Sequence, residues 1–489
     1  MLQQQTNQSQ LQVLYIITKL ELGGAQQVCL ALQQQLTALG HQTVLVSGPE
    51  GQLVAQLAHT NLAPEQVILL PNFQREVQFK ALWRELVNFR QLVQTIKQLR
   101  QRYPHLIVHT HSTKAGLLGR WAAYLAGVRT RVHTIHGYGF HAYQHKLIAT
   151  TIYLLELLTS LITTHYVCVS ARDLSLGAKL FPRFRRKAQL IRSAVDVELF
   201  RPAQRDPTAA AVVTDHSGAA PSALPLAATA LVQPHAPAPD LAKAQFSPRM
   251  IEAPGPVGDA VRAVASANFA SSVITPALAS SARQFSGPQT LQARYDQVAQ
   301  NAQLRHGVPA KFIFGTVACF KPQKNLFDLL LAFEQLRQLA PTRDYRLELV
   351  GDGELRLALE RWIRAHDLSR VVKLHGWCEP QALPTLMMRW QAFALTSLWE
   401  GLPCAVVEAR LLQLPVLAYD IGGVREVIKH GQNGLLYRPG QWLALAQGMH
   451  QLSQAPAFYQ QLNDYPDDLS AFTYQAMIDA HVQLYVGAK

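Results

Sequence analysis

The residues best suited to bind a ligand in this sequence are two glutamates that lie eight positions apart, Glu400 and Glu408. The apolar run of residues 390–395 predicts a buried strand before Glu400, and residues 405–412 predict a helix that carries Glu408. One carboxylate therefore lies in a turn and the other on the helix that follows. Because carboxylates accept hydrogen bonds, this pair suits a ligand rich in hydroxyl groups, such as a sugar.

The turn between the two glutamates has the composition of an anion site. Gly401 lets the backbone approach a ligand closely, and Pro403 can open the helix because its missing N–H would be unpaired there anyway. We expect Leu402, between them, to belong to the same site. Free N–H groups at a helix start favour phosphate. A diphosphate-binding turn flanked by two hydroxyl-binding carboxylates is typical of a nucleotide-sugar site.

The elements that position these residues are strands alternating with helices, which predict parallel sheets in an α/β fold. In such sheets ligands bind at the carboxyl ends of the strands. We expect helices at residues 26–39, 79–102, 111–126, 291–306, 326–339 and 474–485. We expect strands at 11–18, 42–47, 67–70, 106–110, 129–135 and 167–169, and in the second half at 312–318, 345–350, 371–374, 390–395 and 416–419.

Two glycines, Gly23 and Gly24, follow the first predicted strand and precede a helix. This arrangement is typical of a ligand-approaching first turn in a doubly wound sheet, but the spacing is not GxGxxG, so a dinucleotide site is not favoured. A simple tight turn would have the same composition. We therefore expect Gly23 and Gly24 either to line a ligand site or only to turn the chain.

Several polar side chains follow the next strands, among them His111, Lys114 and His136. His109 and His111 alternate along one strand and would face the same way, as two metal ligands could. Neither a carboxylate nor a third ligand stands nearby in the sequence, so we predict no metal site. His136 suits either a ligand contact or a hydrogen-bonded place in the core.

Lysines and glycines occur at the corresponding places in the second half. Lys321 and Lys324 follow its first strand, and Gly351 and Gly353 follow the next. Lysines at a strand end suit a diphosphate as mobile point charges. The alternative is a solvated, lysine-rich turn.

Length and charge bound the class of protein. The chain has 489 residues, enough for two or three domains, and a net charge of +13 with a pI of about 9.6. We find no zinc-finger spacing and no RNA-binding aromatic signature, so an anionic membrane face or an anionic substrate is favoured over nucleic acid. Five scattered cysteines favour a reducing compartment, and the polar N-terminus predicts no signal peptide.

One stretch, Leu147 to Val169, is long and apolar enough to suggest a membrane segment. Glu156 stands in its middle, and a charge at mid-bilayer costs at least about 2.5–3.5 kcal/mol. We therefore expect a buried or surface-lying helix that leads into a strand. Residues 203–300 are rich in Ala, Pro and Ser with no persistent period, and we expect them to be a disordered insertion.

The pattern Glu-Gly-x-Pro-x4-Glu at Glu400–Glu408 resembles the Glu-x7-Glu signature of retaining glycosyltransferases of family 4. The stretch HTHSTKAGLLGR, with HTIHGYGF further on, resembles the N-terminal half of the same family. The resemblance implies a GT-B fold, with two Rossmann-like doubly wound domains facing a cleft. The implied division is residues 1–202, the insertion 203–300, residues 301–470 and a crossover helix at 471–489.

The resemblance also implies roles for these residues. Glu400 would hold sugar hydroxyls, Glu408 the ribose, and His136 the donor sugar. Gly23, Gly24, His111 and Lys114 would line the acceptor side of the cleft, and Gly351 and Gly353 would lie near the nucleotide. Lys324 stands where the family has a Lys, but Cys319 replaces the usual Arg, so we expect Lys321 to supply that charge. Ser193-Ala194 stands at the hinge in place of the usual Asn-Gly.

By this resemblance the protein would move a hexosyl group from a nucleoside diphosphate sugar, such as a UDP-sugar, to a glycan or lipid-linked acceptor. It would work without a cofactor or metal in surface polysaccharide biosynthesis, in the cytoplasm or on the inner face of the membrane. The alternatives are a UDP-sugar epimerase of the same fold and a non-catalytic nucleotide-sugar-binding relative. A basic nucleic-acid-binding protein is a further alternative.

Overall fold

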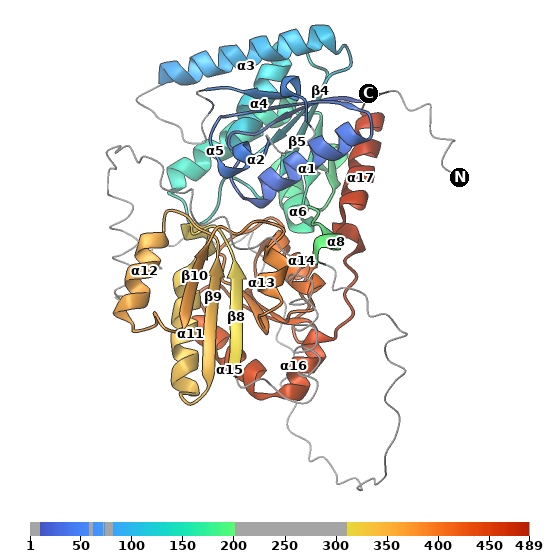
Figure 1. The fold of residues 1–489 in the computed structure, drawn as a ribbon. Coiled ribbons are helices and arrows are strands. Elements are labelled where there is room, and N and C mark those ends of the chain that lie inside the picture. Colours follow the sequence, from blue (N-terminus) through green and yellow to red (C-terminus); the bar gives the residue numbers. More distant parts are fainter. Residues whose placement is uncertain (1–9, 58–61, 72, 74–81, 201–310, 489) are drawn as a thin grey trace, which may run out of the picture. The chain divides into compact units, whose positions relative to one another are not determined.

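The structure is a computed structural model that describes residues 10–57, 62–71, 73, 82–200 and 311–488. Three of our expectations lie outside the described residues: the insertion at 203–300, the helix at 291–306, and the first residues of the helix predicted from 79. The remaining elements form two parallel sheets with helices around them (Figure 1).

The first sheet has seven parallel strands in the order β3-β2-β1-β4-β5-β6-β7. Its strands are β1 (Gln12–Ile16), β2 (Gln42–Ser47), β3 (Val67–Leu69), β4 (Ile107–His111), β5 (Thr130–Ile135), β6 (His165–Cys168) and β7 (Ala188–Leu190). The helices in the same half are α1 (Gly24–Ala38), α2 (Gln52–Leu57), α3 (Leu82–Arg102), α4 (Thr113–Leu125), α5 (Lys146–Ile162), α6 (Ala171–Leu180), α7 (Phe184–Lys187) and α8 (Val197–Phe200).

The second sheet has six parallel strands in the order β10-β9-β8-β11-β12-β13. They are β8 (Lys311–Val317), β9 (Asp344–Val350), β10 (Val372–Gly376), β11 (Ala392–Leu395), β12 (Val416–Tyr419) and β13 (Gly434–Tyr437). The helices are α11 (Leu326–Leu339), α12 (Arg356–Ala365), α13 (Leu383–Met387), α14 (Cys404–Leu411), α15 (Trp442–Gln454), α16 (Pro456–Asn463) and α17 (Tyr474–Gly487), with short 3₁₀ turns η6 (Pro322–Lys324) and η7 (Gly422–Glu426).

Both sheets have the same doubly wound order, which confirms the predicted fold class. In each sheet the chain builds outward in one direction and then reverses, at β1 and β4 in the first sheet and at β8 and β11 in the second. A ligand of such a sheet binds where the order reverses, beyond the carboxyl ends of the strands. We therefore expect a ligand site in the loops after these four strands.

The core of the first sheet is built on both of its faces. Along β1, Val13 and Tyr15 pack on one face, while Leu14 and Ile16 pack on the other. The last helix, α17, joins the first of these two cores through Met477, Ile478, Leu484 and Tyr485, and its Ala488 carbonyl accepts a 2.8 Å hydrogen bond from Thr130. A helix from the end of the sequence thus completes the core around the first strand.

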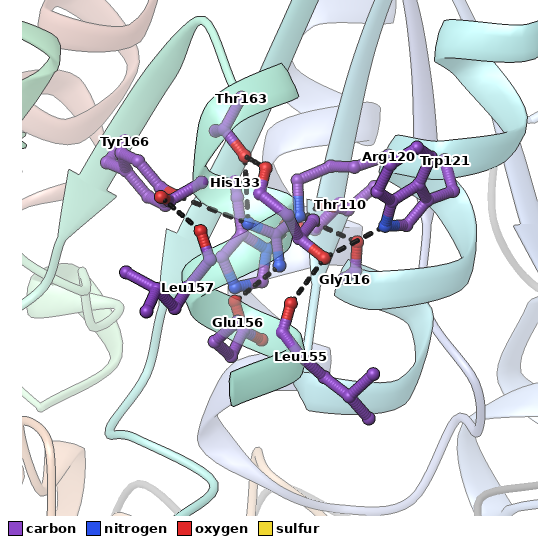
Figure 2. A network of polar contacts seen from close by, with 12 residues as sticks. Thr110, Gly116, Arg120, Trp121, His133, Leu155, Glu156, Leu157, Thr163 and Tyr166 are labelled. Carbon is purple, nitrogen blue, oxygen red and sulfur yellow. Dashed lines mark hydrogen bonds and ion pairs between the residues drawn. The ribbon is translucent and has the colours of Figure 1, made fainter. Parts of the chain in front are cut away.

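The segment with a possible membrane character is a helix, α5, followed by strand β6, as expected. Glu156 is buried and forms a 2.7 Å ion pair with the buried Arg120 of α4 (Figure 2). Arg120 also donates to the Gly116 carbonyl at 2.7 Å and to Thr163 at 3.0 Å. No helix within the described ranges has both the length and the apolar character needed to cross a membrane.

Candidate active site

The loops after β5 and β11 meet at a close backbone contact. A Cβ atom on Gly401 would lie 2.5 Å from the His136 carbonyl oxygen and 3.0 Å from the Gly137 nitrogen. No side chain fits at that distance, so glycine at 401 serves first to bring the two loops together. Gly24, from the loop after β1, lies near the start of α14, where an added Cβ would be 3.6 Å from the Cys404 sulfur.

Glu400 is held by the loop that follows β8. Lys324 forms an ion pair with its carboxylate, and Gln323 donates to the same group at 3.3 Å. The two loops are locked together by main-chain contacts, since Leu398 donates its N–H to the Gln323 carbonyl at 2.8 Å and Thr396 bonds the Asn325 carbonyl at 3.0 Å. The structure therefore joins Glu400 and Lys324, which are 76 positions apart in the sequence.

Glu408 lies one turn inside α14, the helix that begins at Cys404 immediately after Pro403. Burial raises the pKa of its carboxyl from the ordinary 4.5 to about 7. Across the described residues, no hydrogen bond or ion pair engages this carboxylate. Within the part of the chain that the structure describes, it is therefore an acceptor without a partner near the start of α14, and the first N–H groups of a helix attract negative charge.

Lys321 is paired with a residue of the first sheet's leading loop, Glu21. The two groups lie 2.8 Å apart, and Lys19 is 3.2 Å from the other oxygen of Glu21. Burial alone would raise the pKa of Glu21, but its hydrogen bonds to Lys321 and Lys19 lower that pKa below its usual value. The thiol of Cys319 donates to the Leu22 carbonyl at 3.5 Å.

His136, which is half-buried, ends a row of rings that we call the histidine row: His481, His109, His111 and His136, the first three of them buried. Successive ring centroids are 5.6, 4.4 and 5.3 Å apart. His109 bonds Tyr485 of α17 at 2.5 Å through Nδ1 and Thr134 at 2.7 Å through Nε2. The row thus connects the last helix to the loop after β5.

The hydrogen bond between His111 and His136 fixes which ring nitrogens carry protons. Nδ1 of His111 lies 3.0 Å from Nε2 of His136, while Nε2 of His111 is buried with no partner in the described chain. An unpaired buried N–H is rarer than an unpaired acceptor, so the proton of His111 belongs on Nδ1. His136 then accepts at Nε2 and carries its own proton on Nδ1. Burial lowers the pKa of His136 to about 3, with a further contribution from His481, so the ring is neutral.

The remaining predicted residues take the following places. His111 is fully buried, so it supports His136 and does not face solvent. Lys114 pairs with Glu85 of α3 at 2.7 Å. Gly351 and Gly353 form the turn after β9, which packs on the loop after β8 through a 2.8 Å bond from the Phe320 N–H to the Asp352 carbonyl.

The sequence analysis did not predict two glutamates that connect loops near the site, Glu21 and Glu426. Glu21 directly precedes the Leu22-Gly23-Gly24 turn, and this position beside the glycines was the available signal. Glu426, in η7, accepts a 2.6 Å hydrogen bond from the Ala171 N–H at the start of α6 and forms an ion pair with Arg192. No local pattern marks Glu426, because its partners come from a distant part of the chain.

We find no group of three or more His, Cys, Asp or Glu side chains that could hold a metal ion in the described ranges. The two sheets and the glycine-lined meeting of their loops define a protein with the GT-B fold. The sequence matches Glycosyltransferase Family 4 over residues 22–199 and Glycosyl transferases group 1 over residues 302–467. The chain belongs to this family of glycosyltransferases.

Individual relatives agree with the family. The chain is 24% identical over 343 residues to the UDP-Gal:alpha-D-GlcNAc-diphosphoundecaprenol alpha-1,3-galactosyltransferase of Escherichia coli, covering 70% of this chain and 65% of the relative. It is 31% identical over 135 residues to the lipopolysaccharide 1,6-galactosyltransferase of Salmonella typhimurium, covering 27% of this chain and 36% of the relative. These matches span less than two thirds of either relative's length.

Solved structures match the fold over nearly the whole chain. HepE from Anabaena, in complex with UDP and glucose, superimposes with a TM-score of 0.64 at 16% identity, covering 97% of this chain and 99% of HepE. At that identity the likeness establishes the fold.

Proposed function

We propose that the protein is a retaining hexosyltransferase. It takes the hexosyl group from a nucleoside diphosphate sugar, a UDP-sugar, and transfers it to a hydroxyl of a glycan or lipid-linked acceptor in surface polysaccharide biosynthesis. The Escherichia coli relative supports this proposal, since its name gives UDP-Gal as donor and a diphosphoundecaprenol-linked sugar as acceptor. We place the reaction in the cytoplasm, at the inner face of the membrane.

The observation that carries the proposal is the meeting of Glu400, Lys324 and the start of α14 beside His136. A diphosphate needs cations and N–H donors, and a sugar needs hydrogen-bond acceptors. This site offers both at the switch point of the second sheet, beyond β8 and β11. Lys321 adds a second cation on the loop shared with Lys324.

The difficult step is departure of the diphosphate from the anomeric carbon. The bond from that carbon to the phosphate oxygen breaks, a bond to the acceptor hydroxyl oxygen forms, and the hydroxyl proton goes to the departing diphosphate. Lys321, Lys324 and the N–H groups at the start of α14 stabilise the negative charge that develops on the leaving group. Donors of this kind are each worth about 3–4 kcal/mol of transition-state stabilisation.

The other residues hold the donor in place. Glu400 accepts hydrogen bonds from sugar hydroxyls while Lys324 turns toward the diphosphate. Ionised Glu408 accepts from the ribose hydroxyls. His136, neutral and protonated at Nδ1, donates to the sugar. Its low pKa excludes a role as a cationic acid near neutral pH, so we assign it to positioning.

A saturation-transfer NMR screen of nucleotide sugars against the purified protein tests the proposal. We expect a UDP-sugar to bind and Glu408→Ala to weaken that binding strongly. If the Glu408→Ala variant had wild-type kinetics, Glu408 would not bind the ribose. Conversion of the donor without an acceptor would instead indicate an epimerase, and binding without turnover against any acceptor would indicate a non-catalytic protein.

A further inference from the structure

Helix α5 buries three polar side chains and exposes six leucine and isoleucine side chains, although Tyr153 and Leu157 pack against the core. Glu156, Thr159 and Ser160 are the side chains of α5 that are buried. The outward side chains form what we call the apolar face of α5, and their exposed fractions lie between 47% and 70%. The apolar face consists of Leu147, Ile148, Leu154, Leu155, Leu158 and Leu161. A helix in water normally shows the opposite arrangement, and such a patch marks an interaction site.

The rotation of α5 is fixed by its buried polar side. Glu156 pairs with Arg120 at 2.7 Å (Figure 2). Thr159 accepts a 3.0 Å hydrogen bond from Trp121. Breaking a buried pair by turning the helix would leave an uncompensated charge, which is strongly unfavourable. The leucines of the apolar face therefore stay on the outside.

Positively charged residues lie at both ends of α5. Residues 140–192 contain eight Lys and Arg residues but two acidic ones, Glu156 and Asp173, and both acidic side chains are buried. Lys146, exposed, begins α5. At the other end, Lys187 of α7 donates to the Thr163 carbonyl at 2.8 Å, which places α7, with its exposed Arg185 and Arg186, beside the end of α5.

We propose that the apolar face of α5 docks onto an anionic lipid surface, with its leucines in the acyl boundary and the cations at the two ends of the helix at the headgroups. A helix lying in the interface uses this combination of apolar side chains and nearby cations. Docking would hold the protein where a lipid-linked acceptor is presented. The inference rests on α5 and its neighbours and does not require the transfer reaction proposed above.

A second copy of the chain is a poorer occupant of this face. A two-fold dimer through the apolar face of α5 would bring the cations at the two ends of the helix close to their own counterparts, and like charges across an interface are unfavourable. An anionic bilayer reverses the sign of that interaction. Self-association through α5 is therefore an outcome that would overturn the proposal.

The test is sedimentation of the full-length protein with vesicles, without donor or acceptor. We expect binding to vesicles that contain phosphatidylglycerol, weak binding to phosphatidylcholine alone, and loss of binding as salt is added. The double variant Leu154→Ser/Leu158→Ser should bind about tenfold or more weakly, since it removes apolar surface from the interface. Arg185→Glu/Arg186→Glu should also bind more weakly and depend less on salt.

Matched controls lie on α12, where Leu357 and Arg361 are exposed. Leu357→Ser and Arg361→Glu should bind vesicles like the wild type. Circular dichroism and thermal unfolding check that each variant is folded. Absence of wild-type binding to anionic vesicles, equal binding by the α5 and α12 variants, or a lipid-free dimer abolished by Leu154→Ser/Leu158→Ser would overturn the proposal. The donor screen is run without vesicles, so the two proposals can fail separately.

Discussion

Glu408 is the side chain whose protonation affects the proposed reaction most directly. Its pKa of about 7 means that it is largely protonated below neutral pH, and a protonated carboxyl is a weaker acceptor for ribose hydroxyls. We therefore expect kcat/KM for the donor to fall by up to about tenfold per pH unit below pH 7. Glu408→Gln cannot ionise, so its kcat/KM should be low and lack this limb. Steady-state kinetics at varied pH measure both profiles.

The raised pKa of Glu408 also predicts that acidification strengthens this group's own contribution to stability, while it lowers the activity. The native state holds the Glu408 proton up to about pH 7, whereas an unfolded glutamate releases it near 4.5. Stability contributed by this group is therefore full below pH 4.5 and lost as the pH rises toward 7. Glu65→Gln, at an exposed glutamate of the 3₁₀ turn η1 (Pro64–Gln66), is the matched control for both measurements. Parallel pH profiles for the wild type and Glu408→Gln would contradict the assignment.

Substitutions of Lys321 and Glu21 should change the donor KM in opposite directions. In the free protein Glu21 holds Lys321 at 2.8 Å and so competes with the donor diphosphate for that cation. Lys321→Ala should raise the donor KM, while Glu21→Gln should lower it by up to about fivefold, because a half-exposed ion pair is worth at most about 1 kcal/mol. Lys373→Ala, at an exposed lysine of β10, is the control. A donor KM that rises in Glu21→Gln would show that the pair holds the loop and does not compete with the donor.

At the scale of elements, α17 is connected to the site by the histidine row. Tyr485 donates to or accepts from His109 at 2.5 Å and lies 3.2 Å from the hydroxyl of Tyr15. Tyr485→Phe should leave the buried Nδ1 of His109 without a partner and cost about 1–3 kcal/mol of unfolding free energy. Denaturant unfolding measures this loss. Tyr124→Phe, at an exposed tyrosine of α4, is the control, and equal stabilities for the two variants would refute the connection.

The alternation of apolar strands and helices was enough to predict both sheets, and most strand positions agree within two residues. Strand β6 begins at His165, two residues before the predicted start at Val167. The prediction left out His165 and Tyr166 because their polar groups do not form an apolar run. Strand β13, Gly434–Tyr437, was not predicted, since it is short and surrounded by turn residues. Pairing with β12 makes it a strand, and that pairing is invisible to a local pattern.

At the site, the residues that follow strands could be predicted, but their partners could not. Lys324 and Glu400 are each conspicuous in the sequence, while their ion pair depends on β8 and β11 being neighbours. His111 was expected to line a cleft, and its complete burial follows from the packing of α17 against β4. A histidine can either be buried or line a cleft, and only the tertiary packing decides which.

At the scale of the whole molecule, five histidines of the described residues, four of them buried and His136 half-buried, make stability depend on pH. Burial is the main cause that lowers the pKa of each below its usual value. Unfolded histidines gain protons near pH 6.5, while these five stay neutral in the native state. Their stability contribution is therefore full above pH 6.5 and lost as the pH falls toward their native pKa values. The five are His109, His111, His133, His136 and His481.

Other groups oppose this loss only in part. Burial raises the pKa of Asp173 to about 6 and that of Glu408 to about 7, so these two carboxyls gain stability on acidification. Each of the five histidines loses up to about 1.4 kcal/mol of stabilisation per pH unit, whereas the two carboxyls gain stabilisation. The net charge of +13 also grows as the histidines protonate. The thermal midpoint should therefore fall steeply between pH 7 and 5.5. His481→Gln, which keeps a donor for the Met477 carbonyl, should reduce that slope, and equal midpoints at both pH values would show that the histidine row does not control acid stability.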